Sequence, residues 1–260
     1  FNFDLISDLH LGPHETFDWT GQATSSVCIV AGDISRDIET VKETLAHLGK
    51  CYNAVFYIDG NNEHRYNLDM IDCSYDILED ELADIPNVVF LHNNCVIVEG
   101  VAIIGTNGWW TWDFDDQIDD EQCRLWWLDA MKANYHTTDD IIELAHNDVA
   151  YLINSVKKLQ KHQDVKRIVV VTHTVPTKEL IDHDVRLSNT YEFNKMGNSL
   201  MSLVLDEDTE HKIDTWCFGH YHNSIDCNIN KIRYINNCKG QNGDDEWTPA
   251  YYPKRITIDY

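Results

Sequence analysis

The chain has 260 residues, 43% of them hydrophobic, and a formal net charge of -24 at pH 7. This hydrophobic content allows a large core and excludes global disorder. Because long nucleic acids are held mainly by Lys and Arg, the acidity disfavours an extended nucleic-acid interface. No apolar run reaches the roughly 18–20 residues that a membrane helix needs, so we expect no membrane partner.

The first residues of the chain have the alternating pattern of a strand, and no basic segment precedes an apolar segment there. We therefore expect no signal peptide and a cytoplasmic location. The eight cysteines contain no Cys-x-x-Cys pair, which favours reduced buried thiols over disulfides and gives no support for a four-cysteine zinc site. The sequence leaves the oligomeric state open.

Apolar periodicity predicts the elements in chain order. The first part contains strands Phe1–Ser7 and Ser26–Ala31, helix Asp37–Gly49, strand Ala54–Ile58, helix Leu68–Ala83, and strands Asn87–Phe90, Cys95–Glu99 and Val101–Gly105. The second part contains helices Glu121–Ala133 and Asp139–Lys161, strand Lys166–Thr172, helix Asn198–Asp206, and strands Ile213–Phe218, Ile225–Asn228, Lys231–Ile235 and Arg255–Ile258. Strands that alternate with helices, followed by hairpins, favour an α/β sandwich of two mixed sheets.

Residues 106–165 differ in character from the rest because tryptophans and acidic residues crowd into them. We interpret them as an inserted helical, Trp-rich subdomain within a single domain that spans residues 1–260. Trp109 follows a strand near the expected site. It either packs in the core of this insertion, the more common role, or stacks on a nucleotide base.

The strongest apolar strands end in residues of metal-ligand type. They are Asp8 and His10, Asp33, Asn61, His173, and His220 with His222. A single histidine at a strand end is ordinary, but the whole series indicates a common purpose. Imidazole and carboxylate ligands together suit Zn, Mn, Fe or Ni. Seven side chains exceed the needs of one ion, whereas one shared carboxylate makes them sufficient for two ions that activate a hydroxide for attack on phosphorus.

These motifs resemble those of the calcineurin-like metallophosphoesterase family. They read Asp8-Leu9-His10, Gly32-Asp33, Gly60-Asn61-Asn62-Glu63, His173 and Gly219-His220-Tyr221-His222. The resemblance runs from residue 3 to about residue 240. The stretches Gly105–Phe114, Val171–Pro176 and Asn236–Gly240 are similar to a bacterial and phage-type branch, which would place the protein in the cytoplasm of a bacterium or of a phage host.

The resemblance implies a four-layer α/β/β/α sandwich and two divalent ions, with Mn favoured. It assigns one ion to Asp8, His10, Asp33 and His222, and the other to Asp33, Asn61, His173 and His220. Asp33 would then bridge the ions. The implied activity is hydrolysis of a small phosphate ester or nucleotide by in-line attack of a metal-bridging hydroxide.

The chain departs from the family pattern at Asn62, where the family carries a histidine that is thought to bind phosphate and protonate the leaving oxygen. An amide donates a hydrogen bond but delivers no proton. His64 is either a substitute acid or a solvent-facing loop histidine. Some relatives that carry Cys in place of this histidine resemble phosphodiesterases, which favours diesters over monoesters. Arg36 and Lys239 either contact phosphate or form surface ion pairs.

Two other functions stay open. A metal-binding module with weakened catalysis is favoured by Asn62, and it predicts metal binding without turnover. Processing of nucleic-acid ends, as in nuclease relatives, is disfavoured by the net charge of -24.

Overall fold

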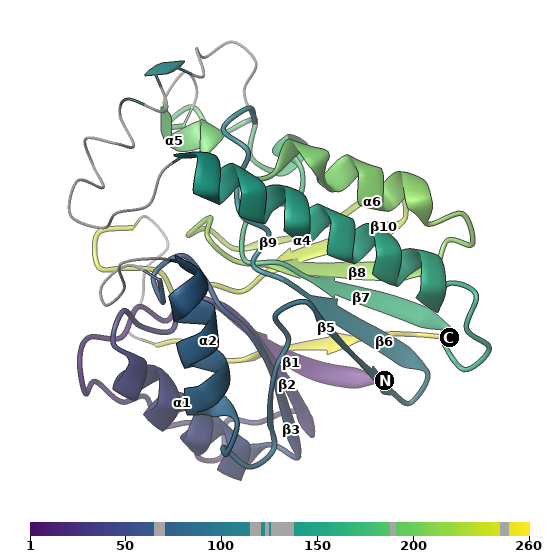
Figure 1. The fold of residues 1–260 in the computed structure, drawn as a ribbon. Helices are drawn as coiled ribbons and strands as arrows, with labels where there is room; N and C mark the ends of the chain where they lie inside the picture. Colours follow the sequence, from purple (N-terminus) through teal and green to yellow (C-terminus); the bar gives the residue numbers. More distant parts are fainter. Residues whose placement is uncertain (65–70, 115–120, 123–124, 126–137, 188–190, 245–249) are drawn as a thin grey trace.

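The computed structural model describes residues 1–64, 71–114, 121–122, 125, 138–187, 191–244 and 250–260. Two sheets pack face to face, and helices cover the outer face of each (Figure 1). The layers run from α1 and α2 at the lower left of Figure 1 to α4 and α6 at the upper right. The predicted four-layer sandwich of two mixed sheets is confirmed.

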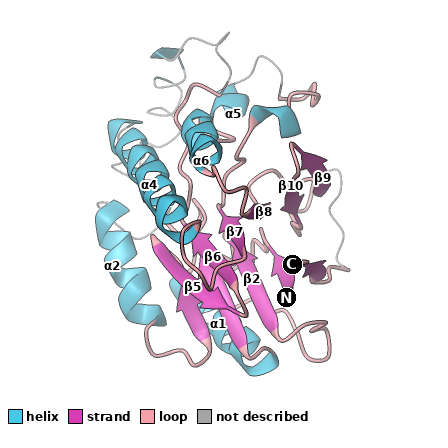
Figure 2. Cartoon of the chain, turned by 90° about the vertical axis from the view of Figure 1, so that its right-hand side faces the viewer, coloured by secondary structure: helices cyan, strands magenta, loops and turns pink. Residues whose placement is uncertain are grey.

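The first sheet has the strand order β11-β1-β2-β3-β4. It consists of β1 (Asn2–Ile6), β2 (Val27–Ala31), β3 (Ala54–Ile58), β4 (Val88–Phe90) and β11 (Lys254–Thr257). Strands β1 to β4 are parallel and β11 joins β1 antiparallel. The two ends of the chain therefore lie beside each other (Figure 2), and the Phe1 amino group donates to the Ile258 carbonyl at 3.1 Å.

The second sheet has the order β5-β6-β7-β8-β10-β9. It consists of β5 (Asn94–Val98), β6 (Val101–Gly105), β7 (Arg167–Val171), β8 (Ile213–Phe218), β9 (Ile225–Ile229) and β10 (Ile232–Asn236). The four inner strands are parallel, and β5 and β9 add antiparallel edges. Parallel inner strands place their carboxyl ends at one edge of the sheet, where ligand sites of such folds lie.

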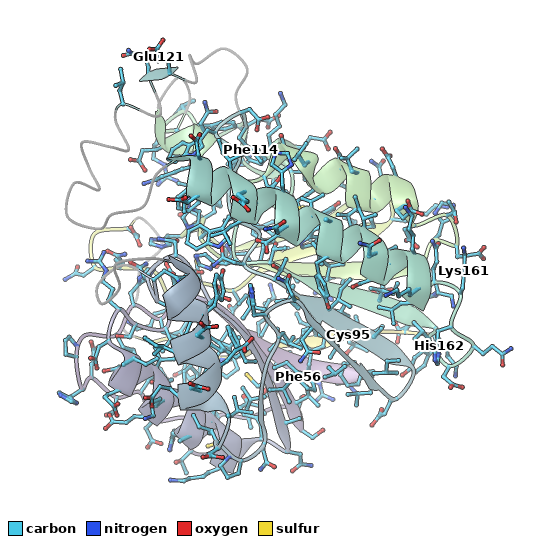
Figure 3. All side chains as sticks on the ribbon, viewed as in Figure 1. Phe56, Cys95, Phe114, Glu121, Lys161 and His162 are labelled. Atoms are coloured by element: carbon cyan, nitrogen blue, oxygen red, sulfur yellow. The ribbon has the colours of Figure 1, made fainter. Side chains whose placement is uncertain are left out.

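The helices are α1 (Ile38–Cys51), α2 (Ile71–Leu82), α4 (Thr138–Leu159), α5 (Tyr191–Asn194) and α6 (Ser202–Glu207), with 3-10 turns at Lys178–Leu180 and Ser199–Met201. Asp37 starts α1 by accepting a hydrogen bond from the Thr40 amide at 3.0 Å. Helix α4 lies on the outer face of the second sheet, over β6 and beside α6, with Lys161 and His162 just beyond its end (Figure 3).

The period-two alternation of the strands separates three apolar layers. Leu5 and Phe56, the latter labelled in Figure 3, face the second sheet, where they meet Ile103 and Val169. Ile6, one residue along β1, faces α1 instead. The outer face of the second sheet packs against α4 and α6 in the same way. The layers are dry and apolar, so polar groups gather at the strand ends.

All eleven predicted strands are present within a few residues of the expected bounds. Of the predicted helix Glu121–Ala133 only residues 121, 122 and 125 are described, all helical, and residues 68–70 of another predicted helix fall outside the described residues. Helix α5 and the 3-10 turn Lys178–Leu180 were not predicted, because segments of three or four residues carry no readable period. The predicted helix Asn198–Asp206 is present as the 3-10 turn Ser199–Met201 followed by α6. The inserted subdomain at 106–165 stays a prediction. The six cysteines that the structure describes are free thiols, as expected.

Candidate metal centre

The predicted ligands meet at the edge where the carboxyl ends of both sheets face each other. Asp8 and His10 follow β1, Asp33 follows β2, and Asn61 follows β3. From the second sheet, His173 follows β7, and His220 and His222 follow β8. The loops that carry these residues are connected through backbone bonds, among them Asp8 N to Gly32 O at 3.0 Å. The structure thus brings all seven side chains together.

Asp8, His10 and His222 form one group that could hold a metal ion. Nε2 of His10 lies 2.8 Å from Nε2 of His222, and each lies within 3.8 Å of Oδ1 of Asp8. The three side chains converge through a carboxylate oxygen and two ring nitrogens. A carboxylate with two imidazoles is a donor set that suits Zn, Mn, Fe or Ni.

Asp33, His173 and His220 form a second such group. Nε2 of His173 lies 3.4 Å from Oδ1 of Asp33 and 3.2 Å from Oδ1 of Asn61. The side chain of His220 is edge-on to that of His173, with ring centroids 5.1 Å apart. The second group therefore offers two imidazoles, a carboxylate and a carboxamide oxygen.

Asp33 connects the two groups. Its Oδ1 faces His173, while its Oδ2 lies 3.8 Å from Nε2 of His10 in the first group. One carboxylate with an oxygen toward each group is the arrangement that a bridging ligand requires.

Hydrogen bonds fix which ring nitrogen three of the histidines present. His173 Nδ1 donates to the Ala31 carbonyl at 2.9 Å, and His220 Nε2 donates to the Lys195 carbonyl at 3.1 Å. His222 Nδ1 donates to the Asp244 carboxylate at 2.8 Å. Each ring therefore turns its other nitrogen toward its group. Such outer partners orient metal-binding histidines in known sites.

The backbone is unusual at four of the candidate ligands. Asp8, His10, Asp33 and His220 have φ angles of 51°, 47°, 55° and 65°. This left-handed region costs an ordinary residue roughly 1–2 kcal/mol. Backbone strain of this kind gathers at functional sites, where the surrounding structure holds it in place.

The charges of the centre are strongly coupled. Burial lowers the pKa of His173, but the Asp33 carboxylate outweighs burial and raises this pKa to about 10. Burial opposes ionisation of Asp33, yet the charges of His173 and His10 hold its pKa well below the usual range. Burial lowers the pKa of His10 and, more strongly, of His220, so both favour the neutral ring that a metal needs.

The buried carboxylate of Asp8 tests whether a metal fits. Asp8 is fully buried, and its Oδ2 has no hydrogen-bond partner among the described residues. Its other oxygen, Oδ1, accepts from the His220 amide at 2.9 Å and lies 3.6 to 3.8 Å from Nε2 of His222 and His10, too far for direct hydrogen bonds to these rings. An uncompensated buried carboxylate is costly, and a cation would remove that cost. The residues present therefore fit divalent ions.

Glu63 joins the loops of the two strands that carry Asp33 and Asn61. Its carboxylate accepts hydrogen bonds from the amides of Gly60 at 2.8 Å, Ile34 at 2.7 Å and Asp33 at 3.2 Å. The Glu of the Gly-Asn-x-Glu motif thus holds the backbone of Asp33.

Asn62 and Arg36 lie together at the mouth of the centre. Arg36 Nε donates to the Asn62 carbonyl oxygen at 2.9 Å. That bond turns the Asn62 amide nitrogen toward Asp33 Oδ2 and to within 3.5 Å of His10 Nδ1. The Asn62 amide nitrogen therefore donates to the Asp33 carboxylate at the mouth of the centre.

His64 does not reach this space. It is 2% exposed and lies beneath the centre, so it is not the solvent-facing loop histidine that one sequence interpretation allowed. Its Nε2 contacts Asp59 at 2.7 Å, and its Nδ1 contacts the Ser74 hydroxyl. Both ring nitrogens are engaged away from the pocket.

Trp109 is also buried, at 2% exposure, and its indole nitrogen donates to the Tyr75 hydroxyl at 2.8 Å. It packs with Trp110, Trp112 and Ile141 in an apolar cluster. Its position favours the core role over base stacking.

Sequence reasoning did not find Asp244 and Asn107. Asn107 Nδ2 donates to Asp59 at 2.7 Å, and its carbonyl accepts from the His173 amide at 2.7 Å, which connects the two sheets beneath the centre. Asp244 lies 22 residues beyond its partner His222. Neither pairing leaves a periodic signal; only the position of Asn107 directly after a strand hinted at a role.

Two cavities open beside the centre. One, of about 370 Å³, is lined by candidate ligands together with Asn62, Arg36 and Arg186. The other, of about 760 Å³, runs between the Gly12 and Gln241 loops and is lined by Lys239. His10, Arg36 and Gln241 border both cavities. The centre therefore has binding space on two sides.

No family model matches the chain. An uncharacterized protein of Acanthamoeba polyphaga mimivirus is 22% identical over 242 residues, which are 84% of this chain and 83% of that protein. The fold is similar to that of phosphopantetheinyl hydrolase from Mycobacterium tuberculosis, with a TM-score of 0.73, 18% identity, and coverage of 99% and 96% of the two chains. The chain therefore shares the fold of this hydrolase over almost its whole length.

A putative 5'-nucleotidase from Staphylococcus aureus matches with a TM-score of 0.51 and 18% identity, over 90% of this chain and 48% of the nucleotidase. GAP50, the anchor in the inner membrane complex of Plasmodium, matches with a TM-score of 0.52 and 12% identity, over 90% and 70%. These likenesses establish the fold. None of the helices in the described part of the chain is long and apolar enough to cross a membrane.

Proposed function

We propose that the protein is a phosphoesterase that uses two divalent metal ions, and that it prefers diesters to monoesters. The observation that carries this proposal is the position of Asp33 between the two three-residue groups, with one carboxylate oxygen toward each. The motif resemblance and the fold shared with a phosphopantetheinyl hydrolase and a putative nucleotidase support it.

Asp8, His10, Asp33 and His222 would hold one ion, and Asp33, Asn61, His173 and His220 the other. When bound, two such ions activate water and neutralise charge on phosphoryl oxygens. Asn62 donates a hydrogen bond to a phosphoryl oxygen, because Arg36 holds its carbonyl and leaves the amide nitrogen facing the centre. Arg36 adds a permanent positive charge beside the phosphate.

The diester preference rests on the space around the centre. A monoester carries one substituent on phosphorus and a diester carries two. The cavities of about 370 and 760 Å³ meet at His10, Arg36 and Gln241, so each can receive one substituent. Asn62 in place of a proton donor weakens catalysis most for poor leaving groups, by roughly 10²–10⁴-fold.

Assays of bis-p-nitrophenyl phosphate and p-nitrophenyl phosphate with added Mn test the proposal. We expect hydrolysis of both, with the diester faster. Asp33→Asn should abolish turnover and lower the bound metal, whereas Asp259→Asn, at an exposed position, should change neither. Unchanged turnover in Asp33→Asn would refute the proposal.

The second candidate is a metal-binding protein with little or no turnover, which the loss of a proton donor at Asn62 favours. A shared fold does not require shared catalysis. This candidate predicts that both ions bind, as measured by elemental mass spectrometry, while no ester in the panel is cleaved.

A further inference from the structure

A site that lacks a general acid can cleave only those phosphate bonds whose leaving group departs without a proton. An alkoxide is about as basic as hydroxide, whose parent water has a pKa of about 15.7, so it leaves well only with a proton. A departing phosphate is a far weaker base, since its second pKa is about 6. It leaves as a stable anion and needs nearby positive charge instead.

The pocket beside the centre holds no free acid of the required kind. Among the described residues that line it, the only histidines are His10, His220 and His222, all candidate ligands. His64 is buried, with both ring nitrogens engaged by Asp59 and Ser74. Asn62 can donate a hydrogen bond but no proton.

The other titratable side chains of this pocket are already engaged in ion pairs or hydrogen bonds. The Arg186 guanidinium holds the pKa of Asp184 far below its usual range, so Asp184 stays ionised. The Tyr221 hydroxyl donates to the same Asp184 carboxylate at 2.8 Å, and Lys195 pairs with Glu192. Asp244 accepts from His222, and in the larger cavity Glu15 and Asp37 accept from the backbone amides of Gly12 and Thr40. The described carboxyl and imidazole groups of the two cavities are therefore already engaged and are not placed to protonate an alkoxide.

A positively charged side chain lies near Asn62, the position where a general acid would be expected. The Arg36 guanidinium, which never deprotonates in proteins, is 2.9 Å from the Asn62 oxygen and borders both cavities. Lys239 lines the larger cavity, and its ammonium donates to the Leu9 carbonyl at 3.1 Å. The larger cavity of about 760 Å³ also has the carboxylates of Glu15 and Asp37 in its wall, but both accept from backbone amides. In a chain with a net charge of -24, two cations at one cavity favour an anionic ligand.

We propose that the substrate is a disubstituted diphosphate, and that the bond cleaved is the P–O–P bridge, with the departing phosphate beside Arg36 in the larger cavity. This inference rests on the proposed phosphoesterase function. Water oxygen bonds to one phosphorus and the bridging P–O bond breaks. Its electron pair stays on the bridging oxygen, which leaves as a phosphate oxyanion. The products are two phosphate monoesters, and the two protons of the water pass to the solvent.

A matched pair of substrates tests the inference. Dithymidine 5',5'-diphosphate has a P–O–P bridge, and the dinucleotide TpT has the same nucleosides with one phosphate and an alkoxide leaving group. We expect kcat/KM for the diphosphate to exceed that for TpT by about 10²-fold or more. Asn62→His should raise cleavage of TpT while leaving the diphosphate rate unimproved. Equal rates on the two substrates would overturn the inference.

Bis-p-nitrophenyl phosphate distinguishes failure of this inference from failure of the proposed function, because nitrophenolate departs without protonation by an acid. If this ester is cleaved but the diphosphate is not preferred to TpT, only the inference fails. If none of the three is cleaved by metal-loaded protein, the proposed function fails with it.

Arg36→Met gives a second readout. We expect it to lower kcat/KM for the diphosphate by tenfold or more relative to its effect on bis-p-nitrophenyl phosphate. Arg167→Met, which removes a half-exposed arginine that contacts Asp214 at the second sheet, is the matched control and should alter neither rate. Equal losses on both substrates in Arg36→Met would contradict a role in stabilising the departing phosphate.

Discussion

The Asp244 carboxylate lies 2.8 Å from Nδ1 of His222 and fixes the ring so that Nε2 faces Asp8. Asp244 also accepts from the Gln241 amide at 2.5 Å, which anchors its loop. A carboxylate behind a histidine both orients the ring and raises its basicity toward a metal. The first metal group therefore depends on a residue that is not itself a ligand.

Asp244→Asn should weaken binding of the ion held by Asp8, His10 and His222 by about 10–100-fold. The amide can still accept a hydrogen bond from His222, but it lacks the negative charge that makes the other ring nitrogen a stronger metal ligand. Titration of the metal-free protein against a competing chelator measures the change. Asp259→Asn serves as the control, and an equal affinity in both variants would contradict the role given to Asp244.

Glu63→Gln should destabilise the metal-free protein by about 1–3 kcal/mol. Both carboxylate oxygens accept from backbone amides, and the amide group of Gln would turn a donor against one set of them. Thermal unfolding in the presence of chelator should show a Tm lower by roughly 2–4 °C per kcal/mol. Glu43→Gln, at an exposed position of α1, should leave Tm unchanged.

Metal binding should release protons, because Asp33 raises the pKa of His173 to about 10 in the metal-free chain. The ring is then protonated at neutral pH and must lose that proton to bind an ion. Affinity should accordingly rise with pH up to about 10 and fall as the pH is lowered. Calorimetric titrations in two buffers of different ionisation enthalpy count the protons. We expect about one per chain from His173, and buffer-independent heats would rule it out.

Asp148 should make stability depend on pH in the opposite direction from an ordinary salt bridge. Burial raises its pKa to about 7, although Thr106, Gly108 and Trp109 donate to it. The folded state holds this proton more tightly than the unfolded state, whose carboxyl has a pKa of about 3.9. Stability is therefore complete below about pH 4 and is lost as the pH rises toward 7.

Asp148→Asn stays neutral at all pH values and keeps a side-chain oxygen that accepts from the Gly108 and Trp109 amides. Its stability should therefore not fall between pH 4 and 7. The difference in unfolding free energy between the variant and the natural chain should grow in favour of the variant between pH 4 and 7, at about 1.4 kcal/mol per pKa unit as an upper bound. Urea unfolding across this range measures it. A constant difference would show that Asp148 titrates normally.

Sequence periodicity predicted the sheets well, because strands buried on both faces read as continuous apolar runs. The positions of Asp8, Asp33 and His173 were predictable for the same reason, since they directly follow such runs. The surroundings of His64 were not predictable. Its burial depends on Ser74 in α2 and on Asp59 at the end of β3, and no local pattern encodes which way a loop side chain turns.

The left-handed backbone at Asp8, His10, Asp33 and His220 has a consequence for mutagenesis. Asp, Asn and His are the non-glycine residues that tolerate this conformation best, so the residue types that bind metal also suit the chain geometry. Alanine at these positions would remove a ligand and strain the turn together, and lost activity could not be assigned to either. Asparagine retains the turn at all four positions; at Asp8 and Asp33 it removes the charge, and at His10 and His220 it removes the imidazole. It is therefore the substitution that separates metal chemistry from folding.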